Sequence, residues 1–116
     1  MRRRSPEDAI QRAVFDRIHA RGVRGLVAIH VPNGGARRRV ETQILKSLGV
    51  TSGVPDKLAW RDNRAYALES KAAAGRLSEV QAAMLDRLAG AGVSCCVARG
   101  LDQALAVFEA WGWSTQ

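Results

Sequence analysis

The stretch DKLAWRDNRAYALESK, residues 56–71, decides the fold of this 116-residue chain. Its two halves, 56–61 and 65–71, are rich in strand-forming residues, and the Asp-Asn-Arg at 62–64 is typical of a tight turn. The stretch therefore predicts a β-hairpin with two antiparallel neighbouring strands.

This hairpin would gather three charged side chains. Asp56 begins its first strand, and Glu69 and Lys71 end the second. Because side chains alternate between the two faces of a strand, Glu69 and Lys71 share a face, and the pairing lets the two carboxylates approach each other. Close carboxylates are costly unless a cation or a proton lies between them.

Two acids and a lysine at one spot are what metal-assisted hydrolysis of a phosphodiester needs. The acids can hold a hard cation such as Mg²⁺, and the lysine can orient water and offset negative charge. Each piece also has an ordinary interpretation: Asp56 as a turn residue after Pro55, and Glu69 with Lys71 as an incidental ion pair.

Two more polar residues fall on apolar helical faces. Glu7 shares a face with Val14 and Ile18 in the first expected helix, and Gln81 lies within the apolar stripe of a later one. Glu7 is either a first-turn acid favoured by the helix dipole or a third acid at the metal. Gln81 either satisfies backbone groups or helps to position the metal, a water or the lysine.

The whole pattern predicts the element order α-β-α-β-β-α-β-α in one α/β domain over residues 1–116, with 1–4 as a flexible basic N-terminus. We expect a mixed sheet with helices on its faces. Besides the hairpin, the expected elements are helices at 5–21, 37–48, 78–89 and 102–111, a buried strand at 26–31 and a last strand at 93–98.

Composition favours nucleic acid as the partner. The net charge of +7 is carried mostly by arginine, whose planar fork suits phosphate. Only six residues are aromatic, which favours duplex or branched DNA over single strands. No apolar run reaches the length of a membrane span, so we expect a cytoplasmic protein without a membrane partner. Cys95 and Cys96 are expected to be free thiols rather than a disulfide or a zinc site.

A flexible turn at Asn33-Gly34-Gly35 precedes Arg37, Arg38 and Arg39. Backbone amides at a helix N-terminus together with arginines would contact phosphate. The alternative is a loop and a solvated basic face.

Taken together, these motifs resemble the VRR-NUC family of the PD-(D/E)xK nuclease superfamily. The resemblance runs from Glu7 to the last helix, and it implies a restriction-endonuclease-like α/β fold. The motifs that carry it are Gly53-Val54-Pro55-Asp56, Glu69-Ser70-Lys71, Gly75-Arg76-Leu77-Ser78 with Gln81, and Asn33-Gly34-Gly35.

The resemblance also implies roles for individual residues. Metal ligands would be Asp56, Glu69, the Ser70 carbonyl and Glu7, with Lys71 as the catalytic lysine and Gln81 as an active-site amide. Contacts to DNA are expected from Asn33, Gly34, Gly35, Arg37, Arg38, Arg39, Lys57 and Arg76. An apolar residue is more usual at Ser70, but this side chain should face away from the site, so the departure concerns packing.

The implied activity is that of a Mg²⁺- or Mn²⁺-dependent endonuclease that cuts branched DNA such as four-way (Holliday) junctions. Such an enzyme would act as a homodimer in DNA repair, without a small-molecule cofactor, in the cytoplasm of a bacterium or of a phage-infected host. The alternatives are a flap or nicking nuclease, a non-catalytic DNA-binding domain of the same fold, and an interaction module in which the motif is coincidental.

Overall fold

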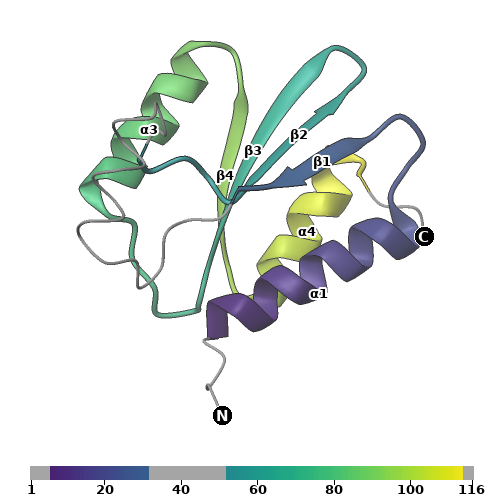
Figure 1. Cartoon of the computed structure of the whole chain (residues 1–116), viewed down its shortest axis with the longest axis horizontal. Helices are drawn as coiled ribbons and strands as arrows, with labels where there is room; N and C mark the ends of the chain where they lie inside the picture. Colours follow the sequence, from purple (N-terminus) through teal and green to yellow (C-terminus); the bar gives the residue numbers. More distant parts are fainter. Residues whose placement is uncertain (1–5, 32–51, 114–116) are drawn as a thin grey trace.

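The computed structural model of the chain describes residues 6–31 and 52–113. Within them, four strands form one sheet in the order β1-β2-β3-β4, flanked by helices (Figure 1). The helix expected at 37–48 lies outside the described residues. The elements are α1 (Pro6–Arg21), β1 (Val27–His30), β2 (Lys57–Arg61), β3 (Arg64–Lys71), α3 (Glu79–Gly90), β4 (Ser94–Arg99) and α4 (Leu101–Trp111).

The expected hairpin is formed by β2 and β3, which pair antiparallel from Lys57 opposite Leu68 to Arg61 opposite Arg64. Asp62 and Asn63 connect them with positive φ values of 51° and 63°. Two consecutive residues in this left-handed region are the signature of a type I′ turn, whose twist matches that of the strands it joins. The sequence prediction is confirmed here.

The sheet is mixed, as expected, and β3 is a central strand between β2 and β4. β1 and β2 pair antiparallel, while β3 and β4 run parallel. A parallel pair needs a crossover, which α3 supplies between the two strands. The five residues at 66–70 are all buried, so the charged end of β3 is enclosed by protein.

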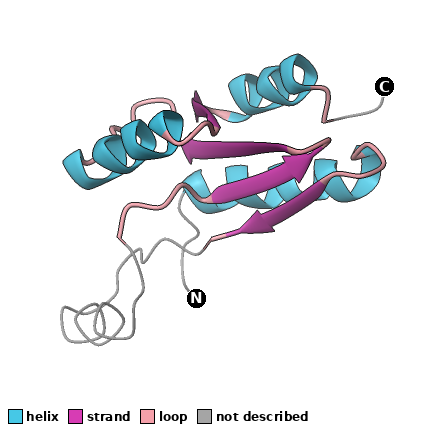
Figure 2. Ribbon diagram, turned by 90° about the horizontal axis from the view of Figure 1, so that it is seen from above, coloured by secondary structure: helices cyan, strands magenta, loops and turns pink. Residues whose placement is uncertain are grey.

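The helices cover both sides of the sheet. α1 and α4 contact each other on one side, which we call the core face, and α3 lies on the opposite side, the α3 face (Figure 1). The view from above in Figure 2 shows the same separation of the helices by the strands. None of the described helices is long and apolar enough to cross a membrane.

The main core lies on the core face. Tyr66 and Leu68 of β3 pack there with Phe108 of α4 and with Trp113, which is fully buried. The ring centroids of Trp113 and Phe108 are 5.3 Å apart, and those of Trp113 and Tyr66 are 5.5 Å apart in an edge-to-face arrangement. Trp113 therefore covers the core of its own domain.

β1 departs from the sequence prediction of a buried strand. Val27 and Ile29 are 58% and 45% exposed. In the described part of the chain β1 is an edge strand with β2 as its single neighbour, and α1 covers one of its faces. Apolar composition identified the strand, but it could not tell whether both faces are covered.

We predict that Trp113→Ala lowers the free energy of unfolding by about 3–5 kcal/mol, because it removes a fully buried indole from the core. The matched control is Trp60→Ala, since Trp60 is 44% exposed and should cost less than about 1 kcal/mol. Urea denaturation followed by circular dichroism measures both. Equal losses for the two variants would contradict this description of the core.

Candidate active site

Three charged residues come together on the α3 face. Continuing the hairpin register by one position beyond the pair of Lys57 and Leu68 puts Asp56 opposite Glu69. Lys71 follows two residues later on the same face of β3. All three side chains are at least nine-tenths buried, with exposed fractions of 4% for Asp56, 2% for Glu69 and 9% for Lys71.

Both oxygens of the Asp56 carboxylate are held. The backbone N–H of Ser70 donates a hydrogen bond to Oδ2 at 3.0 Å, and the ammonium of Lys57 lies 3.5 Å from Oδ1. The carbonyl of Asp56 also accepts a hydrogen bond from the backbone N–H of Val31, at 2.8 Å. The carboxylate is thus fixed from two strands before any ligand binds.

The Gly-Val-Pro before Asp56 has a structural reason. Gly53 has φ +79°, and a Cβ at this position would lie 2.7 Å from the carbonyl oxygen of Val80 in α3. Only glycine allows both this backbone conformation and this close approach. The turn that leads into Asp56 therefore packs directly against the helix that carries Gln81.

Gln81 connects α3 to the acids. Ser78 caps this helix: its hydroxyl accepts from the N–H of Gln81 at 3.1 Å, while its own N–H donates to Oε1 of Gln81 at 3.0 Å. With Oε1 engaged in this capping box, Nε2 of Gln81 points to Glu69 and donates to Oε1 of that carboxyl at 3.1 Å. The amide therefore satisfies a backbone group and also contacts the acid. Its part in positioning a metal, a water or the lysine stays a prediction.

The electrostatics of Glu69 reflect its crowded position. Burial, and after it the neighbouring Asp56 carboxylate, raise the pKa of Glu69 to about 8, although Lys71 acts in the opposite direction. In the metal-free protein this carboxyl thus prefers to hold a proton near neutral pH. A cation between the two acids would relieve the same repulsion.

The donor set fits a hard divalent cation, because it offers two fixed carboxylates whose oxygens suit Mg²⁺ or Mn²⁺. Within the described side chains, no further His, Cys, Asp or Glu completes a group of three around them. Glu7 lies in the first turn of α1, but its side chain is not among those described. Its part in the site stays a prediction.

Lys57 was expected to contact DNA, and the structure does not support this contact. Its side chain is fully buried on the core face, opposite Leu68, with its ammonium 5.1 Å from the ring centroid of Phe15. Burial lowers the pKa of Lys57, while Asp56 acts in the opposite direction. A fully buried ammonium cannot reach a DNA phosphate; Lys57 is instead an internal partner of the Asp56 carboxylate.

The remaining expected residues are placed as follows. Arg76 is exposed, as a contact to DNA requires. The Ser70 side chain is buried, and its hydroxyl has no hydrogen-bond partner in the described part of the chain; its backbone N–H, rather than its side chain, serves the site. Outside the described residues lie Asn33, Gly34, Gly35, Arg37, Arg38 and Arg39.

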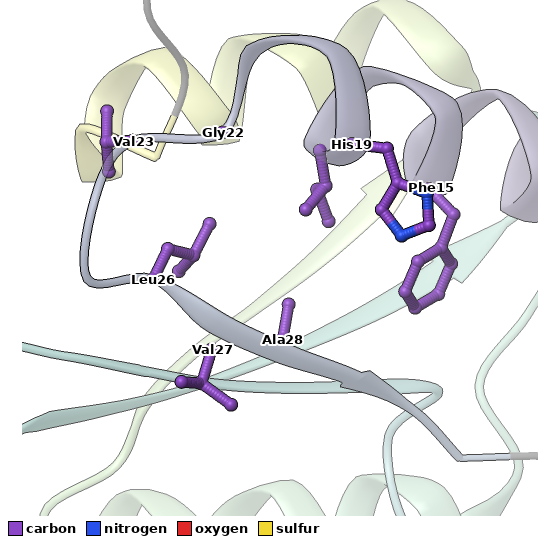
Figure 3. A pocket seen from close by; sticks show the side chains of 8 residues that line it. Phe15, His19, Gly22, Val23, Leu26, Val27 and Ala28 are labelled. Atoms are coloured by element: carbon purple, nitrogen blue, oxygen red, sulfur yellow. The ribbon is translucent and has the colours of Figure 1, made fainter.

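A separate hollow of about 370 Å³ lies between the end of α1 and β1. Figure 3 shows Phe15 and His19 of α1 on one side of it and Ala28 of β1 on the other. None of the residues that line it is an acid or a lysine, so it is not the site of the hydrolytic chemistry.

The mixed sheet, with an acid at the start of one hairpin strand and Glu-Ser-Lys at the end of the other, defines a nuclease-type α/β domain. The family model for the VRR-NUC domain matches residues 5–102. The chain therefore belongs to the VRR-NUC family, as the sequence motifs indicated.

Solved structures agree with this fold. One described as a VRR_NUC domain protein superposes with a TM-score of 0.74 at 20% identity, over 99% of this chain and 100% of that one. Another, described as a VRR_NUC domain, gives a TM-score of 0.64 at 17% identity, over 93% of this chain and 99% of that one. No curated protein matches the sequence.

The raised pKa of Glu69 predicts how the stability of the metal-free protein depends on pH. Unfolding returns this carboxyl to its ordinary pKa of 4.5, so the unfolded chain binds fewer protons between pH 4.5 and about 8. The contribution of Glu69 is therefore full below pH 4.5 and is lost as the pH rises through about 8. Melting temperatures measured in EDTA from pH 5 to 9 should fall across this window.

Glu69→Gln keeps the shape of the protonated carboxyl and cannot ionise, so it should lose less stability over the same pH range. The difference between the two melting curves isolates this one group from every other titrating side chain. Parallel curves for the wild type and the variant would contradict the raised pKa.

Proposed function

We propose that this protein is a Mg²⁺- or Mn²⁺-dependent endodeoxyribonuclease that hydrolyses phosphodiester bonds in branched DNA. The observation that carries the proposal is the convergence of Asp56, Glu69 and Lys71 in one enclosed site on the sheet. A binding module of the same fold has no need for two crowded acids beside a lysine. Membership in the VRR-NUC family supports a nuclease.

Asp56 and Glu69 would hold the divalent ion, which supplies positive charge at the phosphate and makes a bound water more acidic. The Asp56 carboxylate is already held in position by the Ser70 N–H and by the Lys57 ammonium. Glu69 has to release its proton when the ion binds, and the amide of Gln81 keeps its carboxylate in place.

Lys71 would act on the substrate. It ends β3 on the same face as Glu69, and its side chain is 9% exposed at the edge of the enclosed acids. From there its ammonium would orient the attacking water and offset the negative charge that develops on the phosphate.

The choice of branched DNA, such as four-way junctions, rests on the resemblance of this chain's motifs to the VRR-NUC family and on its basic composition. Two symmetric cuts across a junction need two active sites, and one 12.6 kDa domain supplies one, so we propose a homodimer. The net charge of +7 should make affinity for DNA fall steeply as salt is added.

Lys71→Ala is expected to lower the cleavage rate at least about a hundredfold, because it removes the cation that faces the reacting phosphate. DNA binding, measured in Ca²⁺ by fluorescence anisotropy, should change less than about threefold, since most of the affinity comes from other basic residues. The wild type and the variant are compared on labelled duplex, flap, splayed-arm and four-way-junction DNA in Mg²⁺ or Mn²⁺.

Equal cleavage by the two proteins would overturn the role of Lys71. If the wild type cut flap or nicked duplex in preference to junctions, the enzyme would be the flap or nicking nuclease instead. Size-exclusion chromatography with light scattering tests the homodimer, for which a mass near 25 kDa is the expectation of about twice one domain.

A further inference from the structure

Arg99 was not singled out by the sequence, yet it lies directly beside the catalytic end of β3. β3 and β4 run parallel, and their register pairs Lys71 with Arg99. Residues in register on neighbouring strands are about 4.8 Å apart and project on the same side of the sheet. Arg99 and Lys71 thus end adjacent strands at the same edge of the sheet.

The face on which Arg99 projects follows from its own strand. Cys95 of β4 points to α3, where its thiol lies 3.8 Å from the carbonyl oxygen of Leu85. Arg99 is four residues further along, and alternation places it on the same side. It therefore shares the α3 face with Glu69 and Lys71.

The end of β4 is fastened to the end of β3. The backbone N–H of Gly100 donates to the carbonyl of Lys71 at 2.9 Å, and the backbone N–H of Arg99 donates to Oε1 of Gln103 at 2.8 Å. The first bond fixes the end of β4 relative to Lys71, and the second ties the backbone of Arg99 to α4. The guanidinium is held as well, because its Nε donates to the carbonyl of Gly75 at 3.2 Å.

The rest of the Arg99 fork is available to a ligand. The residue is exposed, and within the described part of the chain its two terminal nitrogens make no hydrogen bond and no carboxylate pairs with it. A guanidinium oriented by a backbone carbonyl, with its outer edge open, is suited to two parallel hydrogen bonds to a phosphate.

We propose that Arg99 binds the DNA phosphate next to the one that is cut. It stands one strand beyond Lys71, so a phosphate on its outer edge is displaced from the reacting one by about the spacing of strands. The hydrogen bond from the Nε of Arg99 to the carbonyl of Gly75 orients the guanidinium, and this orientation sets the direction from which DNA enters the site. The inference rests on the proposed nuclease function, and it names the substrate group that this side of the site recognises.

Arg99→Gln and Arg64→Gln form a matched pair of variants. Both remove one positive charge from an exposed arginine of the same sheet. Arg64 lies at the hairpin end of β3, seven residues before Lys71, which places it about 23 Å from the site along the strand. Equal melting temperatures of the two variants and the wild type confirm that each is folded.

We expect Arg99→Gln to raise KM about tenfold while kcat stays within about threefold of the wild type. The slope of log affinity against log salt concentration should become shallower by about 1, which corresponds to the loss of one phosphate contact. Arg64→Gln should leave KM and kcat within about twofold of the wild-type values. Arg99→Lys should restore part of the affinity, since it keeps the charge but loses the fork.

The position of the phosphate is tested with substrates that carry one uncharged methylphosphonate at each of the five phosphates around the cut. For the wild type, a methylphosphonate at one position adjacent to the cut should weaken binding about tenfold, because it removes the charge that Arg99 contacts. Arg99→Gln should be insensitive to that substitution and remain sensitive to the others.

Identical behaviour of Arg99→Gln and Arg64→Gln, or the same sensitivity to every methylphosphonate in Arg99→Gln and the wild type, would overturn the phosphate contact. A wild type that cuts no substrate in any divalent ion would instead overturn the proposed function. The binding measurements in Ca²⁺ would still decide the contact of Arg99 in that case, so the two failures are distinguishable.

Discussion

The structure depends on the placement of two carboxylates opposite each other in an enclosed part of the sheet. Ionised together and without a cation, Asp56 and Glu69 repel each other where little water is present to screen them. The groups around the two carboxylates offset this repulsion. A backbone N–H and a buried ammonium hold Asp56, an amide from α3 holds Glu69, and the pKa of Glu69 rises to about 8. We propose that a divalent cation takes the place of the Glu69 proton in the active enzyme.

The two lysines of the hairpin each lie near one of these acids, Lys57 near Asp56 and Lys71 near Glu69. Lys57 lies on the core face, fully buried under Phe15, and serves Asp56 from inside the protein. Lys71 lies on the α3 face at the end of β3 and is 9% exposed, more than either acid. The two lysines lie on neighbouring strands, and Lys57 pairs with Leu68, three residues before Lys71. Because side chains alternate along a strand, this odd spacing puts the structural cation and the one that we propose for catalysis on opposite faces of the sheet.

The sequence predicted the hairpin because an Asp-Asn turn and two strand-like halves leave few alternatives, and the alternation of β3 then placed Glu69 and Lys71 together. It misplaced Lys57, since a lysine argues for the surface, whereas its register opposite Leu68 puts it in the core. It also missed the exposure of β1, which depends on which helices cover the sheet. Arg99 could not be found because its pairing with Lys71 joins residues 28 positions apart, and local patterns do not reveal parallel register.

Binding of Mn²⁺ measured by isothermal titration calorimetry at pH 7 tests the central claim most directly. The wild type should bind the ion and release protons to the buffer, because Glu69 gives up its proton on binding. The double variant Asp56→Asn, Glu69→Gln, which keeps both side-chain shapes, should lose at least about tenfold in affinity and release none from this site. Undiminished binding by the double variant, or no binding by the wild type, would contradict a metal site at these two carboxylates.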